Sequence, residues 1–411
     1  MSCHIKGKMV RVFINTNGCS LGQLESKRVE EFLVRNNDAI RITPYPKEAD
    51  VIIFYACGLT DVSEKASLKT IEQLQSDRKP LSRIIVWGCL PKINPESLSA
   101  VYDGPLIGPR DIDFFNELVG KRNCHCHEVW ANTLVKRNEN DRYAGLHHTS
   151  FLNDKILRNL SRPFRKKHDY ENEDIFYLRV AEGCNGHCTY CSEKLAWGEI
   201  TSRPINEVTA EFKLGIQKGY KRFFLSAEDL SAYGKDLGYT CIDLLREIIR
   251  EDKNGCCRLI IDQLNAEFLK PNLHQLFHIF SSGRIELFNC QVQSGSNRIL
   301  KLMGRKYLSE DWREAMLSIN KNFPEMKIGT HFMVGFPSES EEDFKETLKL
   351  LDYPLLISVC NVYVFSSKSR AVAARMKEQV PESVKKSRYI RLWRKYLYMH
   401  LFHSTIGRLT N

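Results

Sequence analysis

Short apolar runs alternate with longer amphipathic stretches along most of this 411-residue chain, and this alternation restricts the fold more than any other feature. In the first part of the chain, strand-like runs at 10–15, 51–56 and 84–88 precede helix-like stretches at 21–35, 61–75 and 95–101. Strands that alternate with helices usually form a parallel sheet covered by those helices. The sequence therefore predicts an α/β fold that begins with a small parallel domain.

A second, longer series of strand-like runs follows, at 176–181, 222–226, 258–261, 285–291, 327–334 and 359–365. Six βα-type units predict a partial or complete TIM-like (β/α)6 barrel, whose reactive groups lie at the carboxyl ends of the strands. A polar, basic stretch without periodicity separates the two series. We therefore expect an N-terminal α/β domain at 1–127, a linker at 128–174, a barrel at 175–380 and a basic amphipathic helix at 381–411 that packs on the barrel.

The composition excludes several classes of protein. Hydrophobic residues make up 43% and charged residues 27%, as in an ordinary soluble protein. No apolar run approaches the ~18 residues of a membrane helix, and the first residues lack the apolar core of a signal peptide. We expect a cytoplasmic protein without a membrane partner. The net charge of +10 permits an anionic partner such as RNA but does not require one.

Fourteen cysteines in a reducing compartment point to metal ligands or buried thiols rather than disulfides. Cys184, Cys188 and Cys191 form a C-x3-C-x2-C triplet after the strand-like run at 176–181. Three thiolates so spaced can hold three irons of a [4Fe–4S] cluster and leave the fourth iron open. S-adenosylmethionine (SAM) could chelate that iron and be cleaved reductively to a 5′-deoxyadenosyl radical. Zinc, with His187 or a remote residue as fourth ligand, and structural thiols are the alternatives.

Three more cysteines, Cys19, Cys57 and Cys89, each follow a strand-like run of the N-terminal domain. Parallel neighbouring strands place their carboxyl ends side by side, so these thiols can converge and hold a second [4Fe–4S] cluster. A glycine or alanine before each cysteine would let the backbone approach the cluster closely, and helix N-termini would offer N–H groups to its sulfides. Buried thiols at strand ends are the alternative.

The Cys124-His125-Cys126-His127 segment contains four residues that can bind zinc. Alternating residues of a strand face opposite sides, however, so the four side chains would not converge. A structural role is therefore the favoured interpretation of this segment.

Together these motifs resemble the radical SAM methylthiotransferases, which insert a methylthio group at an unactivated C–H bond. Beyond the two cysteine triplets, the likeness is carried by Glu25-Ser26, Ala49-Asp50, Ser202-Arg203-Pro204, Tyr233-Gly234 with Asp236, Val292-Gln293-Ser294-Gly295-Ser296, Met303-Gly304-Arg305, and Val334-Gly335-Phe336-Pro337 with Glu339, Glu342 and Phe344. The resemblance implies two [4Fe–4S] clusters, SAM, and an electron donor such as flavodoxin or ferredoxin. The open iron of the N-terminal cluster would hold the transferred sulfur.

The resemblance also implies a SAM pocket at the ends of the barrel strands. We expect it to include Tyr190, Arg203, Ser226, Glu228, Gln293 and Ser294. Two of these have other interpretations: Arg203 could pair with a surface carboxylate, and Gln293 could satisfy local backbone groups.

The substrate implied by the family is a macromolecule, either a tRNA adenosine or an aspartate of a protein or peptide. The segment at 227–234 is more similar to the branch that acts on a ribosomal-protein aspartate. Two segments differ from the family pattern. The threonine–aspartate pair of the family reads Thr330-His331 here, and its S-x-R-x-G-T segment reads Ser-Ser-Lys-Ser-Arg-Ala at 366–371. The RNA-gripping C-terminal β-barrel module of the family would begin near 406–411. Another radical SAM enzyme that forms a C–S bond on a peptide or small molecule, and a non-enzymatic iron–sulfur or zinc scaffold, are the alternatives.

Overall fold

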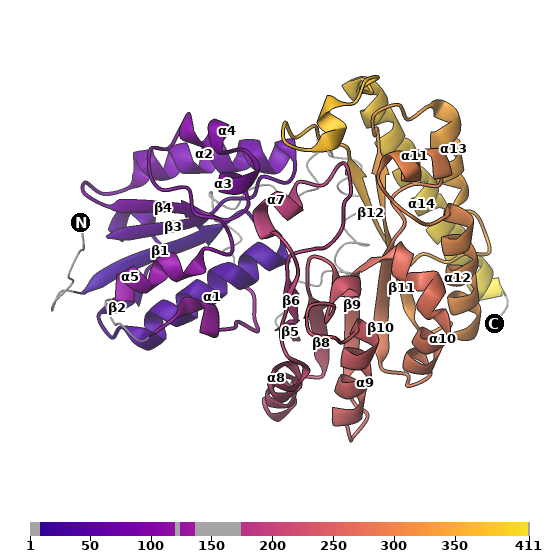
Figure 1. The fold of residues 1–411 in the computed structure, drawn as a ribbon, viewed down its shortest axis with the longest axis horizontal. Helices are drawn as coiled ribbons and strands as arrows, with labels where there is room; N and C mark the ends of the chain where they lie inside the picture. The colour runs from indigo at the N-terminus through magenta and orange to yellow at the C-terminus, as the bar shows by residue number, and fades with distance from the viewer. Residues whose placement is uncertain (1–8, 120–123, 136–173, 410–411) are drawn as a thin grey trace. The chain divides into compact units, whose positions relative to one another are not determined.

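The computed structural model describes residues 9–119, 124–135 and 174–409, with side chains described up to residue 400 (Figure 1). The chain divides into two compact units. The N-terminal unit consists of residues 1–173 together with Ser192–Gly198 and Lys368–Arg370, and the barrel unit consists of the remaining segments. Most of the linker expected at 128–174 lies outside the described residues.

The N-terminal unit is built on a parallel sheet of four strands in the order β2-β1-β3-β4. Its strands are β1 (Val10–Thr16), β2 (Ile40–Ile42), β3 (Val51–Tyr55) and β4 (Arg83–Trp87), and its helices and 3₁₀ turns are α1 (Ser20–Asn36), η1 (Pro46–Glu48), α2 (Asp61–Asp77), α3 (Leu90–Ile93), α4 (Pro95–Ser99), η2 (Ile112–Phe115), α5 (Asn116–Val119), η3 (Cys126–Glu128) and α7 (Glu193–Trp197). All five residues of β3 are buried, because helices cover both faces of the sheet.

The barrel unit contains a second parallel sheet, of six strands in the order β12-β11-β10-β9-β8-β5. Its strands are β5 (Ile175–Arg179), β8 (Arg222–Ser226), β9 (Arg258–Asn265), β10 (Ile285–Gln291), β11 (Lys327–Val334) and β12 (Val359–Val364). Its helices and 3₁₀ turns are α8 (Ile205–Gln217), η4 (Leu230–Ala232), α9 (Cys241–Glu251), η5 (Ala266–Phe268), α10 (Leu269–Phe280), α11 (Asn297–Leu302), α12 (Ser309–Asn322), α13 (Glu341–Lys349), η6 (Val372–Arg375) and α14 (Glu382–Leu409). The strands β5 and β12 are the two edges, so the sheet is an open barrel of six βα-type units and the predicted α/β fold class is confirmed.

The sequence patterns did not predict three features of the fold. The edge strand β2 has only three residues, two of them exposed. A two-stranded antiparallel sheet of β6 (Ala181–Glu182) and β7 (Thr201–Ser202) flanks the segment that contains the cysteine triplet. The helix α7 lies within that segment, yet it packs into the N-terminal unit, where the Trp197 side chain is buried.

The long C-terminal helix α14 packs against β12 and β11, as its amphipathic pattern predicted. Tyr389, Leu392 and Tyr396 form its buried side. None of the helices within the described ranges has the length and the apolar character needed to cross a membrane.

Candidate active site

The cysteine triplet of the barrel unit lies on the loop after β5 and β6, and each of its three cysteines is partly exposed. Burial raises the pKa of the Cys184 thiol above its usual range. Asp229, Cys191 and Cys188 add to this rise in the pKa, while the N–H of Gly186, 3.1 Å from the sulfur, lowers it. The three thiols are therefore near enough to influence one another's charge.

The spacing of these thiols bears on the kind of metal they fit. Four ligands around a zinc ion, each at about 2.3 Å, lie roughly 3.8 Å apart. Within the described part of the chain, neither cysteine triplet gathers three sulfurs that are all within 4.8 Å of one another, and His187 does not complete such a group. The described thiols of the two triplets therefore do not have the close spacing of a zinc site.

The cysteine loop is fixed to the end of α11. Thr189 donates from its N–H to the Met303 carbonyl at 3.0 Å and from its hydroxyl to the Leu302 carbonyl at 2.8 Å. Gly304 has a φ of +77°, and a Cβ at this position would lie 2.9 Å from the carbonyl oxygen of His187. A glycine is therefore needed here for the loop to pack against the helix end.

Tyr190, which the sequence predicted in the SAM pocket, is paired with Arg305. The Arg305 guanidinium donates to the Tyr190 hydroxyl and lies 5.7 Å from the ring centroid. Burial raises the pKa of the Tyr190 hydroxyl, so it is a neutral acceptor at pH 7. Arg305 belongs to the Met303-Gly304-Arg305 motif, and no sequence pattern connects it to a tyrosine more than a hundred residues away.

Glu228, also predicted in the SAM pocket, holds the start of the cysteine loop. Its carboxylate accepts from Arg179 at 2.5 Å and from the N–H of Gly183 at 2.8 Å. Burial raises the pKa of Glu228, although Arg179 and the Gly183 N–H oppose this. Sequence reasoning missed Arg179, since a charged residue inside a strand carries no signal of its partner.

Arg203 occupies a similar supporting position beside β5. Its guanidinium donates to Glu211 at 2.5 Å and to the Arg179 carbonyl at 2.8 Å. Its carbonyl in turn accepts from the Tyr233 hydroxyl at 2.7 Å. The Ser202-Arg203-Pro204 and Tyr233-Gly234 motifs are thus joined in the structure, which also links Ser202 to Gly234 at 2.8 Å.

Gln293 bridges the ends of β10 and β11 in a left-handed backbone conformation, with a φ of +65°. Its N–H donates to the His331 carbonyl and its carbonyl accepts from Met333, both at 2.8 Å. These bonds are made by its backbone, whereas its side-chain amide nitrogen donates to the Gln291 side chain at 3.3 Å. Its Oε1 atom, and the Ser226 hydroxyl at the end of β8, are buried and have no hydrogen-bond partner within the described residues.

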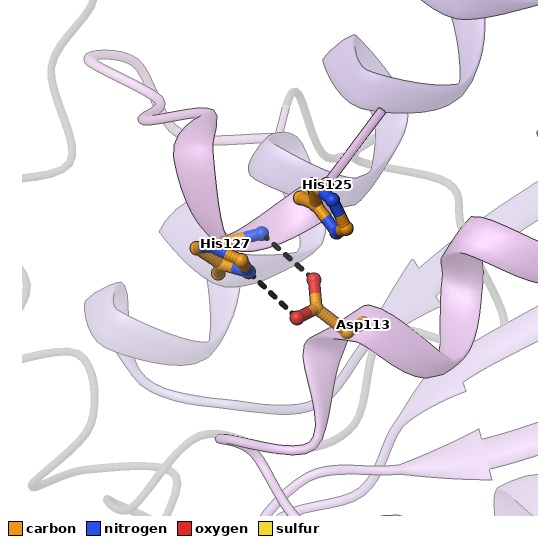
Figure 2. A group of neighbouring side chains, drawn as sticks. All are labelled: Asp113, His125 and His127. Carbon is orange, nitrogen blue, oxygen red and sulfur yellow. Dashed lines mark hydrogen bonds and ion pairs between the residues drawn. The ribbon is translucent and has the colours of Figure 1, made fainter. Parts of the chain in front are cut away.

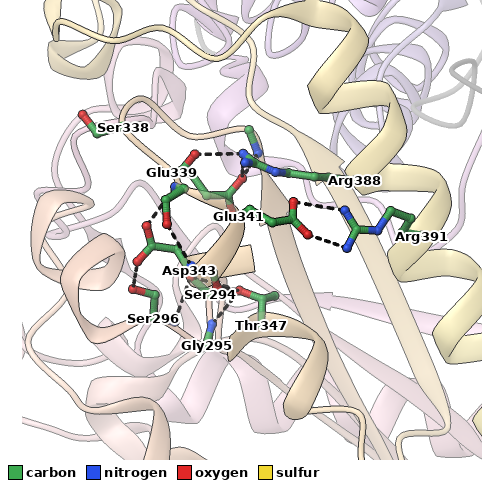
Figure 3. A network of polar contacts seen from close by, with 12 residues as sticks. Ser294, Gly295, Ser296, Ser338, Glu339, Glu341, Asp343, Thr347, Arg388 and Arg391 are labelled. Carbon is green, nitrogen blue, oxygen red and sulfur yellow. Dashed lines mark hydrogen bonds and ion pairs between the residues drawn. The ribbon is translucent and has the colours of Figure 1, made fainter. Parts of the chain in front are cut away.

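Ser294 belongs to a polar network that fixes the loop after β10 to α13 and α14 (Figure 3). The Ser294 hydroxyl lies 3.3 Å from the Thr347 hydroxyl, which also accepts from the Gly295 N–H at 3.0 Å. The Ser296 hydroxyl donates to Asp343 at 2.5 Å. The QSGS motif is therefore held by residues of α13 that the sequence motifs did not include.

His331, at the position where the family pattern has an aspartate, belongs to a network of polar side chains on neighbouring strands. The Nε2 atom of His331 lies 3.0 Å from the amide nitrogens of both Asn289 and Asn361. The Asn289 amide also donates to Asp262 at 2.7 Å. Burial lowers the pKa of His331 in spite of the Asp262 charge, so its imidazole is neutral at pH 7.

The three cysteines predicted at the strand ends of the N-terminal unit follow β1, β3 and β4, which are neighbours in the sheet. Burial and then the charge of Cys57 raise the pKa of Cys19 to about 12, although the N–H groups of Gly22 and Leu21 lower it. The pKa of Cys89 is raised by burial, by Cys57 and by Cys19. The three thiols thus lie in one neighbourhood, with backbone N–H groups of α1 directed at one of them.

Tyr55, the last residue of β3, was not singled out from the sequence. Its hydroxyl lies 3.1 Å from the Cys89 sulfur. A Cβ added at Gly18, Gly22 or Gly88 would lie 3.0, 2.7 or 3.1 Å from the Tyr55 ring. The glycines before Cys19 and Cys89 therefore make room for this ring.

The comparisons with known proteins match both parts of the chain. A family model described as "Radical SAM superfamily" matches residues 178–351, and one described as "Uncharacterized protein family UPF0004" matches residues 11–105. The threonylcarbamoyladenosine tRNA methylthiotransferase MtaB of Aquifex aeolicus is 30% identical over 385 residues, which cover 92% of this chain and 86% of that protein. The ribosomal protein uS12 methylthiotransferase RimO of Protochlamydia amoebophila is 27% identical, with 91% and 74% covered.

Two solved structures share the fold. The radical SAM methyltransferase TsrM of Kitasatospora setae superposes with a TM-score of 0.58 at 12% identity, covering 89% of this chain and 75% of that one. The cobalamin-dependent SAM radical enzyme OxsB gives a TM-score of 0.53 at 14% identity, with 95% and 56% covered. At such low identity they support the fold alone. The sequence relatives extend over nearly the whole chain, and this protein belongs to the radical SAM methylthiotransferase family.

Proposed function

We propose that this protein is a methylthiotransferase that holds two [4Fe–4S] clusters and modifies a tRNA adenosine. Membership of the family makes it a sulfur-transferring enzyme that uses SAM and a [4Fe–4S] cluster. The observation that carries the proposal of a second cluster is the position of Cys19, Cys57 and Cys89, which follow the carboxyl ends of three adjacent parallel strands. Such a set of three thiols is suited to a cluster with one open iron.

The six cysteines would be the cluster ligands, three in each unit. With SAM, a cluster on Cys184, Cys188 and Cys191 supplies a 5′-deoxyadenosyl radical when bound. The protein contributes hydrogen bonds to the ligand sulfurs. The Gly186 N–H is directed at Cys184, and the Tyr55 hydroxyl lies against Cys89.

The six residues proposed for SAM differ in their surroundings. Ser226 and Gln293 have buried oxygen atoms without a partner in the described residues, which favours direct hydrogen bonds to a polar ligand. Tyr190 lies on the cysteine loop, with Arg305 supporting its hydroxyl. Arg203, Glu228 and Ser294 already have protein partners, so we assign them the task of positioning the loops around SAM.

The tRNA substrate is favoured by the names of several relatives, which are threonylcarbamoyladenosine tRNA methylthiotransferases. The net charge of +10 suits a polyanionic substrate. An aspartate of a ribosomal protein is the second candidate, favoured by the segment at 227–234 and by the likeness to RimO. We further propose that a flavodoxin or ferredoxin donates the electrons and that the protein is located in the cytoplasm.

The cluster assignment is tested by metal analysis of anaerobically reconstituted protein. Wild type should hold about eight irons per chain. Replacing Cys184, Cys188 and Cys191 by alanine should halve the iron and abolish formation of 5′-deoxyadenosine. The same replacement of Cys19, Cys57 and Cys89 should halve the iron, keep SAM cleavage and stop sulfur insertion. Cys256→Ala, at an exposed cysteine, is the control and should retain both the iron and the activity.

The substrate is tested by mass spectrometry of tRNA nucleosides and of ribosomal-protein peptides from cells with and without the gene. We expect a methylthio-adenosine that disappears from the tRNA of the deletion strain and returns with the wild-type gene. A methylthio group lost from a protein aspartate would identify the second candidate instead. If neither modification changes, the proposed substrate classes are wrong even when the iron content is as expected.

A further inference from the structure

Asp113, His125 and His127 form a group of potential metal ligands on the surface of the N-terminal unit (Figure 2). One ligand atom from each of these residues lies within 4.8 Å of the other two. Asp113 comes from η2, His127 from η3, and His125 immediately precedes η3. All three side chains are exposed, so a metal ion could reach them directly from solvent.

The backbone around the two histidines is held in place by several hydrogen bonds. The N–H of Cys126 donates to Asn116 at 2.9 Å, and the N–H of His127 donates to Asp113 at 3.2 Å. The carbonyl of His127 accepts from Arg28 at 2.7 Å. Preorganisation of this kind reduces the entropy lost when ligands are fixed around a metal ion.

The Cys124-His125-Cys126-His127 segment leads into the 3₁₀ turn η3 and does not form the strand expected from the sequence, but its cysteines and histidines still lie on different sides. Cys126 is fully buried in the core and Cys124 packs partly against it. The two imidazoles instead lie on the exposed side, with ring centroids 5.3 Å apart. Both histidines therefore lie beside Asp113 and apart from the two cysteines.

The chemistry of this group suits a borderline divalent metal ion. Two imidazoles and one carboxylate are common zinc ligands and leave a fourth position for water. The Asp113 carboxylate lies 2.6 Å from the Nδ1 atom of His127, so two of the three ligand groups already face each other.

A second group of potential ligands among the described residues, Asp252, Cys256 and Cys257, is less suited to a cation. The Asp252 carboxylate is 2.9 Å from the Arg284 guanidinium and accepts from the Cys257 N–H at 3.1 Å. A resident positive charge opposes the binding of a metal ion at this carboxylate.

We propose that Asp113, His125 and His127 bind one divalent transition-metal ion of the zinc class and that the ion cross-links η2 to η3. This site is separate from the six cysteines assigned to iron–sulfur clusters, and it does not depend on the proposed substrate. An ion joined to both turns stabilises the N-terminal unit because it binds the folded chain in preference to the unfolded one.

The test uses the full-length protein with its clusters reconstituted anaerobically, so that the ligand cysteines are occupied. After treatment with a chelator and desalting, the protein is titrated with ZnCl2 in a calorimeter, and its zinc content and thermal unfolding are measured. Wild type should take up one zinc per chain with a Kd in the micromolar range or tighter, and its melting temperature should rise. MgCl2 should give neither effect, because magnesium prefers oxygen ligands.

Variants locate the zinc. His125→Ala/His127→Ala should lose the zinc and the rise in melting temperature, and Asp113→Asn should weaken binding about tenfold or more. His274→Ala/His278→Ala, which removes another exposed histidine pair, should bind zinc like wild type. Cys256→Ser should do the same. Wild type that takes up no zinc, or zinc that persists in the His125→Ala/His127→Ala variant, would overturn the proposal and leave only a surface ion pair.

Discussion

The Tyr55 ring occupies a space that glycines leave open beside the cysteines of the N-terminal unit. Gly22 is the most restrictive of them, since a Cβ there would lie 2.7 Å from the ring. The ring position in turn fixes the hydroxyl 3.1 Å from the Cys89 sulfur. A hydrogen bond to a ligand sulfur stabilises the more negative, reduced state of an iron–sulfur cluster. Tyr55 is thus placed to set the potential of the proposed cluster.

Tyr55→Phe should lower the reduction potential of the N-terminal cluster by tens of mV, because the ring remains and only the hydrogen bond is lost. The measurement is a redox titration followed by electron paramagnetic resonance, with Cys184, Cys188 and Cys191 replaced by alanine so that one cluster is observed. Tyr102→Phe is the control, because its buried hydroxyl bonds the backbone of β4 and no cysteine. An unchanged potential in Tyr55→Phe would show that the hydroxyl does not act on the cluster.

The neutral imidazole of His331 should make the stability of the barrel unit depend on pH. Burial lowers the pKa of His331 from its ordinary value of 6.5. Below about pH 6.5 the unfolded chain therefore binds a proton that the folded chain does not, so the free energy of unfolding falls as the pH falls. The contribution is fully present at pH 7 and above and is lost on the acid side.

His331→Asn should make the free energy of unfolding less dependent on pH. Between pH 7 and pH 5, this free energy should fall by less than in wild type, with a difference of at most about 2 kcal/mol. The asparagine oxygen can still accept from Asn289 or Asn361. Urea unfolding of both proteins at several pH values measures the effect. His274→Asn, at an exposed imidazole, should keep the wild-type slope. Equal slopes for His331→Asn and wild type would contradict the assignment of a buried neutral histidine.

For single residues, the sequence predicts a role where a reactive residue type occurs in an unusual pattern. The sequence selects six cysteines as proposed cluster ligands, three by their close spacing and three by their position after strands, because few other functions explain such patterns. It could not identify Tyr55, Arg305 or Arg179, whose roles depend on a partner brought near only by folding. A tyrosine at a strand end and an arginine within a strand have many ordinary explanations.

Among the elements, α14 is joined by two ion pairs to the loop before α13 and to the first residue of α13, and the two pairs have different surroundings. Arg388 donates to Glu339 at 2.8 Å, and both side chains are almost fully buried. Burial raises the pKa of Glu339 to about 7, although the Gly335 N–H and Arg388 oppose the rise. One helical turn further on, Arg391 pairs with Glu341, and about 40% of each side chain is exposed. Figure 3 shows both pairs.

Arg388→Ala should destabilise the barrel unit by about 3–5 kcal/mol, because it leaves the Glu339 carboxyl buried without its cation. The loss should be larger at pH 8 than at pH 5, since the unpaired carboxyl can be protonated at the lower pH. Arg391→Ala is the matched control, and it should cost no more than about 1 kcal/mol. Chemical denaturation at the two pH values measures both. Similar losses of stability for the two variants would show that the buried Arg388–Glu339 pair stabilises the unit no more than the exposed Arg391–Glu341 pair does.

The elements that the sequence predicts well are those with a strong internal pattern. The barrel strands β8, β10 and β11 begin and end at the predicted residues, because apolar runs that are buried on both faces have clear boundaries. The strands β2, β6 and β7 have two or three residues each. Strands this short form by pairing with an adjacent strand, and they contain too few residues to show a periodic pattern in the sequence.

At the scale of the whole molecule, neither of the two units is one continuous segment of the chain. The chain leaves the barrel unit after Cys191, contributes Ser192–Gly198 to the N-terminal unit, and returns. Lys368 makes a second such contribution. Its buried amino group pairs with Glu64 at 2.6 Å and Asp61 at 2.9 Å, more than three hundred residues away. A sequence read in order predicts consecutive domains, and it carries no signal for these long-range insertions.

This arrangement predicts that the N-terminal unit depends on α7 for its core. Trp197 is 2% exposed and packs in the cluster that contains Trp87 and Phe115. Trp197→Ala in the full chain should destabilise the N-terminal unit by about 3–5 kcal/mol, the usual cost of removing a buried tryptophan. A fragment of residues 1–173 should show a loss at least as large, because it lacks the whole helix.

Hydrogen exchange measures each unit separately, through the amides of β3 for the N-terminal unit and of β10 for the barrel unit. Trp197→Ala should accelerate exchange in β3 and leave β10 protected. Trp312→Ala is the matched control, since Trp312 is equally buried but donates to the Cys290 carbonyl within the barrel unit. It should accelerate exchange in β10 alone. If the 1–173 fragment protects β3 as well as the full chain does, α7 contributes nothing to that core and the two units can be separated at a single point of the chain.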